Sequence, residues 1–198
     1  MKIVIAPDKF KGSLPGTEVA AAIAAGLRAE LPAAELVAIP VADGGDGTVD
    51  AAVAAGFERV PVTVDGPTGE PVRASYARRG EVAVVELATA CGLMRLPGGR
   101  REPLTASSFG AGQALEAALE AGARRIVFGV GGSASTDGGA GLLQALGARI
   151  LDTRGEPLAR GGAALRDVAA LDLAGLSPAL RPGTVILATD VANPLTGP

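Results

Sequence analysis

A glycine-rich segment with hydroxyl and carboxyl side chains runs from Gly129 to Gly141. It has six glycines in thirteen residues, follows an apolar run at 125–128 and precedes a helical pattern at 142–146. Glycine lets the backbone approach a ligand closely, and the free amides at a helix start favour anions. This order of elements predicts a phosphate-binding loop. A loop that turns tightly only to pack a helix on a sheet would have the same composition.

Polar side chains within this segment narrow the chemistry. Ser133, Ser135 and Thr136 add hydroxyl donors, whereas Asp137 would repel a bare anion. A carboxylate beside a phosphate-binding loop therefore indicates a cation between them, as in a magnesium–nucleotide site. Because the sequence contains no histidine, a Ser-His-Asp hydrolase and a His-ligated zinc site are excluded within it. Oxygen ligands favour magnesium over zinc.

Two lysines follow the first apolar run of the chain, which spans 2–6. Lys9 and Lys11 lie in a polar loop with Ser13, and they are candidates to contact a phosphate or a carboxylate. A solvated pair on an N-terminal loop is the alternative.

A second acidic loop follows the apolar run 35–41. Asp43 and Asp46 flank Gly44 and Gly45 there, so the two carboxylates could share a magnesium ion or accept a proton. Asp and Gly are also ordinary turn residues, which leaves a purely structural turn open.

The elements that must position these residues follow from hydrophobic periodicity. Strands at 2–6 and 35–41 are each followed by a polar loop and a helix, the first from Thr17 and the second over 48–55. Repeated strand–loop–helix units predict an α/β fold whose loops bind ligands at the carboxyl ends of parallel strands.

The pattern changes near residue 57. Alternating apolar residues at 60–64 and 72–76 around a turn at 65–69, followed by the run 82–85, predict antiparallel strands and a second domain. Further on, a helix entered at 107–110 precedes the glycine-rich segment. The last predicted strand, 184–188, leads to Asp190 and Asn193.

Composition limits the class of protein. The 198 residues are 48% hydrophobic and carry a net charge of −3, which gives no support for nucleic-acid binding. Cys91 is the one cysteine, as expected in a reducing compartment. No apolar run is long enough to span a bilayer, and the first residues do not have the pattern of a signal peptide. These features predict a cytoplasmic protein.

Four motifs resemble the type I glycerate kinases, the bacterial glycerate 2-kinase family. They are APDKFKGSLPGTEVAAAIAAG at 6–26, VADGGDGTVDA at 41–51, GVGGSASTDGGAGLLQALGA at 129–148 and ATDVANPLTG at 188–197. Members of that family are much longer, so the chain resembles their N-terminal part and is expected to be a fragment.

The resemblance implies a two-part architecture. Residues 1–58 would begin a flavodoxin-like parallel-sheet α/β domain, of which the first two βα units are present. Residues 59–198 would form most of an inserted β-rich α/β domain of the swivelling type. The oligomeric state is not implied.

The resemblance also implies an activity, namely transfer of the ATP γ-phosphoryl group to D-glycerate with Mg²⁺, giving 2-phosphoglycerate. The partners would be glycerate and a nucleotide, with no nucleic acid and no membrane. The implied catalytic residues are Asp137, Asp190 and Lys9, and the implied metal ligands are Asp43 and Asp46. The implied substrate or phosphate contacts are Lys11, Ser13, Gly44, Gly45, Gly131, Gly132, Ser133, Ser135 and Asn193. The general base is left open among four carboxylates, those of Asp43, Asp46, Asp137 and Asp190.

Two other functions are consistent with parts of the sequence. A dinucleotide-dependent oxidoreductase would use the glycine-rich segment as its cradle, although 129–141 contains no clean G-x-G-x-x-G after a first strand. A catalytically inactive binding module is the second alternative.

Overall fold

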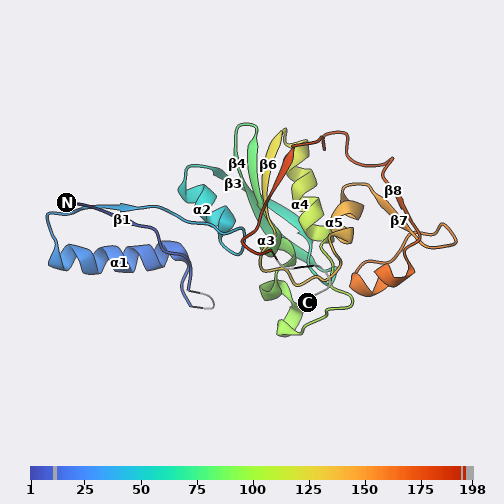
Figure 1. Ribbon diagram of the computed structural model, residues 1–198, viewed down its shortest axis with the longest axis horizontal. Coiled ribbons are helices and arrows are strands. Elements are labelled where there is room, and N and C mark those ends of the chain that lie inside the picture. Colours follow the sequence, from blue (N-terminus) through green and yellow to red (C-terminus); the bar gives the residue numbers. More distant parts are fainter. Residues whose placement is uncertain (11–12, 193, 195–198) are drawn as a thin grey trace.

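The structure, a computed structural model, describes residues 1–10, 13–192 and 194. Within these residues, the strands form a five-stranded sheet with the order β3-β4-β5-β6-β9, called the large sheet below, and the two-stranded sheets β1-β2 and β7-β8 (Figure 1). None of the helices in this part of the chain combines the length and apolarity needed to cross a membrane.

The N-terminal elements form a small lobe at one end of the molecule (Figure 1). Strands β1 (Lys2–Ile5) and β2 (Glu35–Ala38) pair in parallel, and the helix α1 (Gly16–Glu30) connects them. Ile5 packs with Ala20 and Ala24 of α1, so the helix covers one face of this sheet. The other face carries Val4, which is more than half exposed.

The large sheet is antiparallel at one side and parallel at the other. The β3–β4 and β4–β5 pairs are antiparallel, whereas β5–β6 and β6–β9 are parallel. Its strands are β3 (Glu58–Asp65), β4 (Pro71–Arg79), β5 (Val82–Glu86), β6 (Arg125–Gly129) and β9 (Val185–Ala188).

Helices cover both faces of the large sheet, as the alternation along β5 requires. Ala83 and Val85 point into a core formed with α4 (Phe109–Glu120), while Val84 points to the opposite face against Val49 of α2 (Thr48–Ala54). The remaining elements are α3 (Leu87–Cys91), η1 (Leu93–Arg95), η2 (Pro97–Gly99), α5 (Ala140–Ala145), β7 (Arg149–Leu151), η3 (Gly162–Asp167) and β8 (Ala170–Asp172).

Most of the elements predicted from the sequence are present, and the mixed α/β class with parallel strands is confirmed. The second predicted strand, 35–41, is shorter and ends at Ala38. The short helix α3 and the β7–β8 hairpin were not predicted, because each has too few residues to show a period.

The packing of α2 bears on the expected domain division. Val49, Ala52 and Val53 of this helix pack against the large sheet and not against the β1–β2 sheet. This contact links the last helix of the predicted first domain to the large sheet, and the boundary near residue 58 stays a prediction.

Close packing of α4 on α5 generates a stability prediction. A Cβ atom at Gly112 would lie 2.5 Å from the carbonyl oxygen of Leu142 and 2.7 Å from Cβ of Ala145. We expect Gly112→Ala to lower the free energy of unfolding by about 1–3 kcal/mol, because backbone atoms must shift. Denaturant unfolding followed by circular dichroism measures the change.

Gly26→Ala is the matched control, since Gly26 is also helical and nothing lies within 4 Å of its added Cβ. This variant should be more stable by about 0.5–1 kcal/mol. Equal effects of the two substitutions would contradict the packing described for α4.

Candidate active site

The loops that follow β1, β2, β6 and β9 meet where these strands end. The amide of Gly131, after β6, donates to the carbonyl oxygen of Gly44 at 2.9 Å. The amide of Val130 donates to the carbonyl oxygen of Ala188, the last residue of β9, at 3.3 Å. Three segments that are far apart in the sequence are thus in backbone contact.

The glycines in these segments allow this contact. A Cβ at Gly129 would lie 2.5 Å from the carbonyl oxygen of Gly44, and one at Gly131 would lie 2.7 Å from Cα of Gly45. A Cβ at Gly44 would overlap the carbonyl oxygen of Ala188. Side chains at these positions would therefore force the loops apart.

The same contacts involve two of the predicted phosphate-binding amides, those of Gly45 and Gly131. The Gly131 amide is used by Gly44, and the Gly45 amide donates to Oδ1 of Asp43 at 2.8 Å. Neither N–H group is free in this structure to bind a phosphate.

An ion pair joins the first and second loops. Nζ of Lys9 lies 3.2 Å from both carboxylate oxygens of Asp43 and 3.5 Å from Oδ1 of Asp8. The side chains of Lys9 and Asp43 are only 14% and 27% exposed, so solvent screens this pair less than a surface pair.

Both partners are held in their charged forms. The amide of Gly45 holds the pKa of Asp43 below its ordinary value; burial opposes this shift, and Lys9 reinforces it. Burial alone would lower the pKa of Lys9, but the hydrogen bonds and charges of Asp43 and Asp8 outweigh burial and raise it. Asp43 is therefore a weak proton acceptor, and its engagement with Lys9 argues against the predicted use as a magnesium ligand.

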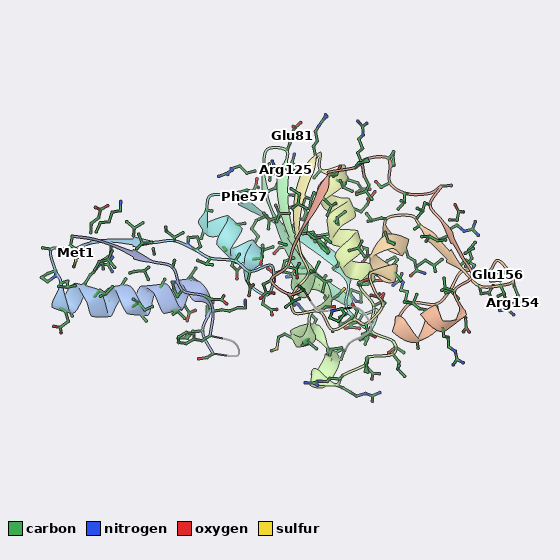
Figure 2. The ribbon with its side chains drawn as sticks, viewed as in Figure 1. Met1, Phe57, Glu81, Arg125, Arg154 and Glu156 are labelled. Atoms are coloured by element: carbon green, nitrogen blue, oxygen red, sulfur yellow. The ribbon has the colours of Figure 1, made fainter. Side chains whose placement is uncertain are left out.

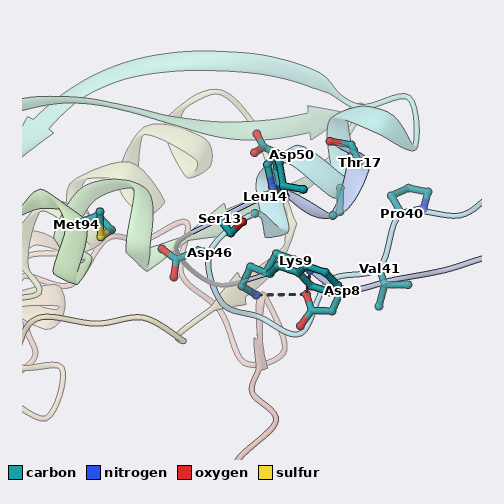
Figure 3. A pocket seen from close by; sticks show the side chains of 15 residues that line it. Asp8, Lys9, Ser13, Leu14, Thr17, Pro40, Val41, Asp46, Asp50 and Met94 are labelled. Carbon is teal, nitrogen blue, oxygen red and sulfur yellow. Dashed lines mark hydrogen bonds and ion pairs between the residues drawn. The ribbon is translucent and has the colours of Figure 1, made fainter. Parts of the chain in front are cut away.

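A cavity of about 440 Å³ lies beside Lys9. Figure 3 shows Lys9, Ser13, Asp46 and Met94 around it. The lining residues come from the loop before α1 and the start of that helix, from the loop before α2 and the first turn of that helix, and from the η1 turn. The small lobe and the part built on the large sheet thus both contribute to it.

Asp46 connects this cavity to the glycine-rich loop. Its side chain lines the cavity, and a Cβ at Gly132 would lie 2.8 Å from Oδ2 of Asp46. Among the described residues, no group of three or more His, Cys, Asp or Glu side chains is arranged to hold a metal ion. The predicted pair Asp43 and Asp46 therefore does not form a complete metal site by itself.

Asp137 has a different environment from the one predicted. Its side chain is buried, with 1% exposure, and it is not among the residues that line the cavity. Oδ2 accepts hydrogen bonds from the Ser108 amide at 2.8 Å, the Ser108 hydroxyl at 2.9 Å and the Ser107 hydroxyl at 3.3 Å.

The Asp137 carboxylate also occupies the start of α5. The amide of Gly139 donates to Oδ1 and that of Gly141 to Oδ2, both at 3.2 Å. The anion position predicted at this helix start is thus filled by the protein's own carboxylate, which also binds residues that precede α4. This burial argues against a direct catalytic role and favours a structural one.

The other predicted site residues named below do not line the cavity or lie outside the described residues. Ser133 accepts a hydrogen bond from the Ser135 amide at 3.0 Å, and their hydroxyls lie 2.9 Å apart, but neither residue lines the cavity. Asp190 follows β9 and is exposed, outside the cavity lining. Lys11 and Asn193 lie outside the described residues.

Glu86, the last residue of β5, is a buried carboxylate that was not among the predicted site residues. Its side chain is buried, with 4% exposure, and its oxygens accept hydrogen bonds from the amides of Gly47 at 3.2 Å and Val49 at 2.9 Å. The available signal was a carboxylate at the end of an apolar run, 82–85, which is where functional side chains gather in α/β sheets.

The fold and the site define an α/β protein with a small-molecule site built from loops at strand carboxyl ends. The model of the glycerate kinase family matches residues 3–198. The chain therefore belongs to the glycerate kinase family, which confirms the resemblance in its sequence motifs.

Named relatives agree with this membership. The chain is 48% identical to the glycerate kinase of Bacillus subtilis (strain 168) and 48% identical to the glycerate 2-kinase of Escherichia coli (strain K12). These matches cover 100% of the chain but 53% and 52% of the relatives, so the chain spans about half their length.

A solved structure is also similar. A crystal structure of a Salmonella typhimurium LT2 protein provisionally named glycerate kinase 2 matches with a TM-score of 0.85 and 47% identity. The match covers 100% of this chain and 54% of that one. These comparisons favour a kinase over the dinucleotide-dependent oxidoreductase.

The Lys9–Asp43 pair generates a pH prediction. The lowered pKa of Asp43 means that the pair stabilises the fold above the pKa of Asp43 in the unfolded chain, and that this contribution is lost as pH falls through the folded-state pKa. We expect a carboxyl NMR titration to give a midpoint for Asp43 below its ordinary value.

Lys9→Met should move this midpoint part of the way back, because the Gly45 amide remains. Lys2→Met is the control, since Lys2 forms an exposed ion pair with Glu35 at 3.2 Å. An Asp43 midpoint that is identical in the Lys9→Met variant and the parent would contradict the described ion pair.

Asp137 generates a second prediction, on stability. We expect Asp137→Ala to lower the free energy of unfolding by about 2–4 kcal/mol, because buried amides lose their acceptor. Asp172→Ala is the control, as its ion pair with Arg149 is exposed. Should the two variants unfold at the same denaturant concentration, the buried network around Asp137 would not be a stabilising one.

Proposed function

We propose that this chain is the N-terminal part of a kinase that transfers the ATP γ-phosphoryl group to D-glycerate and forms 2-phosphoglycerate. The observation that supports this most is that the Lys9 loop and the 43–47 loop line one cavity, while the glycine-rich loop lies in backbone contact with the 43–47 loop. The relatives named glycerate kinase and glycerate 2-kinase favour this substrate and this position of phosphorylation.

Lys9 supplies positive charge at the proposed site. Its ammonium group lies at the cavity, is held in place by Asp43 and Asp8, and remains protonated because its pKa is raised. We assign it the binding of an anionic group, either the glycerate carboxylate or a phosphate. Fixed positive charge that needs no rearrangement is the main contribution a protein makes to phosphoryl transfer.

The residues around the cavity offer Mg²⁺ a suitable carboxylate ligand, and the proposed ATP would supply further oxygen ligands. Asp46 provides a carboxylate at the cavity and next to Gly132, and oxygen donors of this kind suit Mg²⁺. We propose Asp46 as its protein ligand. When bound with ATP, Mg²⁺ would neutralise phosphate charge.

Two of the four candidate proton acceptors, Asp43 and Asp137, are disfavoured by their environments. Asp137 is buried within its own hydrogen bonds, and Asp43 has a lowered pKa, so both are poor acceptors. Because Asp46 is assigned to Mg²⁺, we propose that the acceptor is Asp190, which follows β9 and is exposed.

We retain three wider predictions as proposals. The small lobe would belong to a flavodoxin-like domain, and the part built on the large sheet would be an inserted swivelling domain. Glycerate and a nucleotide would be the partners, with no nucleic acid. The cytoplasm would be the location, because ATP is present there and Cys91 is a buried free thiol.

The activity test uses the complete gene product. We expect 2-phosphoglycerate from D-glycerate and Mg·ATP, and a loss of about 100-fold or more in kcat/KM in Lys9→Met, because a preorganised charge is removed. A coupled assay for 2-phosphoglycerate measures both.

Lys2→Met is again the control. The Lys2 ammonium pairs with Glu35 across the β1–β2 sheet, so this substitution should leave turnover unchanged. Full activity in Lys9→Met would overturn the site assignment. Binding of both ligands without turnover in the complete gene product would favour the inactive binding module instead.

A further inference from the structure

Glu86 joins the large sheet to the loop that carries Asp43 and Asp46. It ends β5, and its carboxylate accepts hydrogen bonds from the amides of Gly47 and Val49 at the start of α2. These amides come from residues 39 and 37 positions earlier in the chain. The contact is therefore a long-range tether between two parts of the molecule that both reach the candidate site.

Glu86 is costly to bury. Burial raises the pKa of its carboxyl group, the two amides oppose this, and the nearby charges of Asp46 and Asp50 add to the rise. A raised pKa in the folded state means that stability is lost as pH rises through that pKa, so the ionised carboxylate does not add to stability at neutral pH. Its two hydrogen bonds nevertheless fix the Gly47 and Val49 amides at the start of α2.

The tethered loop is short and internally bonded. Gly47 has a φ of +93°, and the Thr48 hydroxyl donates to the carbonyl oxygen of Gly45 at 2.7 Å. At the other end of the loop, Asp43 accepts from the Gly45 amide and binds Lys9. A displacement of Gly47 would therefore also move Gly45, which Thr48 binds, and with it the Asp43 side chain, which Gly45 binds.

We propose that Glu86 is a positioning residue that clamps the end of the 43–47 loop to the large sheet. The clamp thereby keeps Asp46 and the Lys9–Asp43 pair in their places at the cavity. This proposal rests on the proposed kinase function for its catalytic consequence. Its structural content, the clamp itself, does not depend on any ligand.

The test uses Glu86→Gln, which keeps the size of the side chain but points an NH₂ group at one of the two amides. Its control is Glu81→Gln, because Glu81 lies just before the other end of β5 (Figure 2) and its exposed carboxylate forms an ion pair with Arg124. Should Glu86→Gln fail to fold, Glu86→Asp keeps the charge and shortens the reach by one methylene.

Three readouts are measured on the same protein samples. We expect amide exchange at Gly47 and Val49 to be at least about tenfold faster in Glu86→Gln. The titration midpoint of Asp43 should rise towards its ordinary value. The kcat for glycerate phosphorylation should fall by about 10–100-fold, with a smaller change in KM for ATP. Glu81→Gln should match the parent in all three.

Unchanged exchange at Gly47 and Val49 would overturn the clamp. Faster exchange with an unchanged Asp43 midpoint would overturn the positioning role and leave a purely local contact. If the parent protein makes no 2-phosphoglycerate, the proposed function fails, and exchange together with the Asp43 titration still decides the positioning role.

Discussion

The backbone contact between Gly44 and Gly131 is the constraint on which the candidate site depends. The hydrogen bond from the Gly131 amide to the Gly44 carbonyl oxygen places the loop after β2 directly on the loop after β6. Glycine is required at both positions, because a Cβ at Gly131 would lie 2.7 Å from Cα of Gly45 and a Cβ at Gly44 would overlap the carbonyl oxygen of Ala188 in β9. Once these loops touch, Asp46 lies against Gly132, and Lys9 reaches the same place through Asp43.

Two buried carboxylates, those of Asp137 and Glu86, fix the two loops that form the Gly44–Gly131 contact. Asp137 binds the amides at the start of α5 together with Ser107 and Ser108, and Glu86 binds the amides at the start of α2. Each carboxylate thus accepts hydrogen bonds from backbone amides at the N-terminal end of a short helix. The protein thus uses its own anions to fix the two loops, and the positive charge of Lys9 stays at the cavity.

The sequence predicted the loops but not the roles of all their residues. Apolar runs and glycines identified the strands and the turns after them, because these signals are local. The burial of Asp137 was not predictable in this way, since its hydroxyl partners Ser107 and Ser108 lie 30 and 29 residues away in the chain. Glu86 was missed for the same reason, as its two amide partners belong to another strand–loop–helix unit.

A titration of isotope-labelled protein with Mg·ATP, followed by amide NMR signals, tests the shared site most directly. The account predicts that signals from the 43–47 loop and from Gly132 and Ser133 shift together, with one dissociation constant, and that the Lys9→Met variant weakens both sets equally. Shifts confined to the glycine-rich loop, with the 43–47 loop unaffected, would contradict a single site built from these segments.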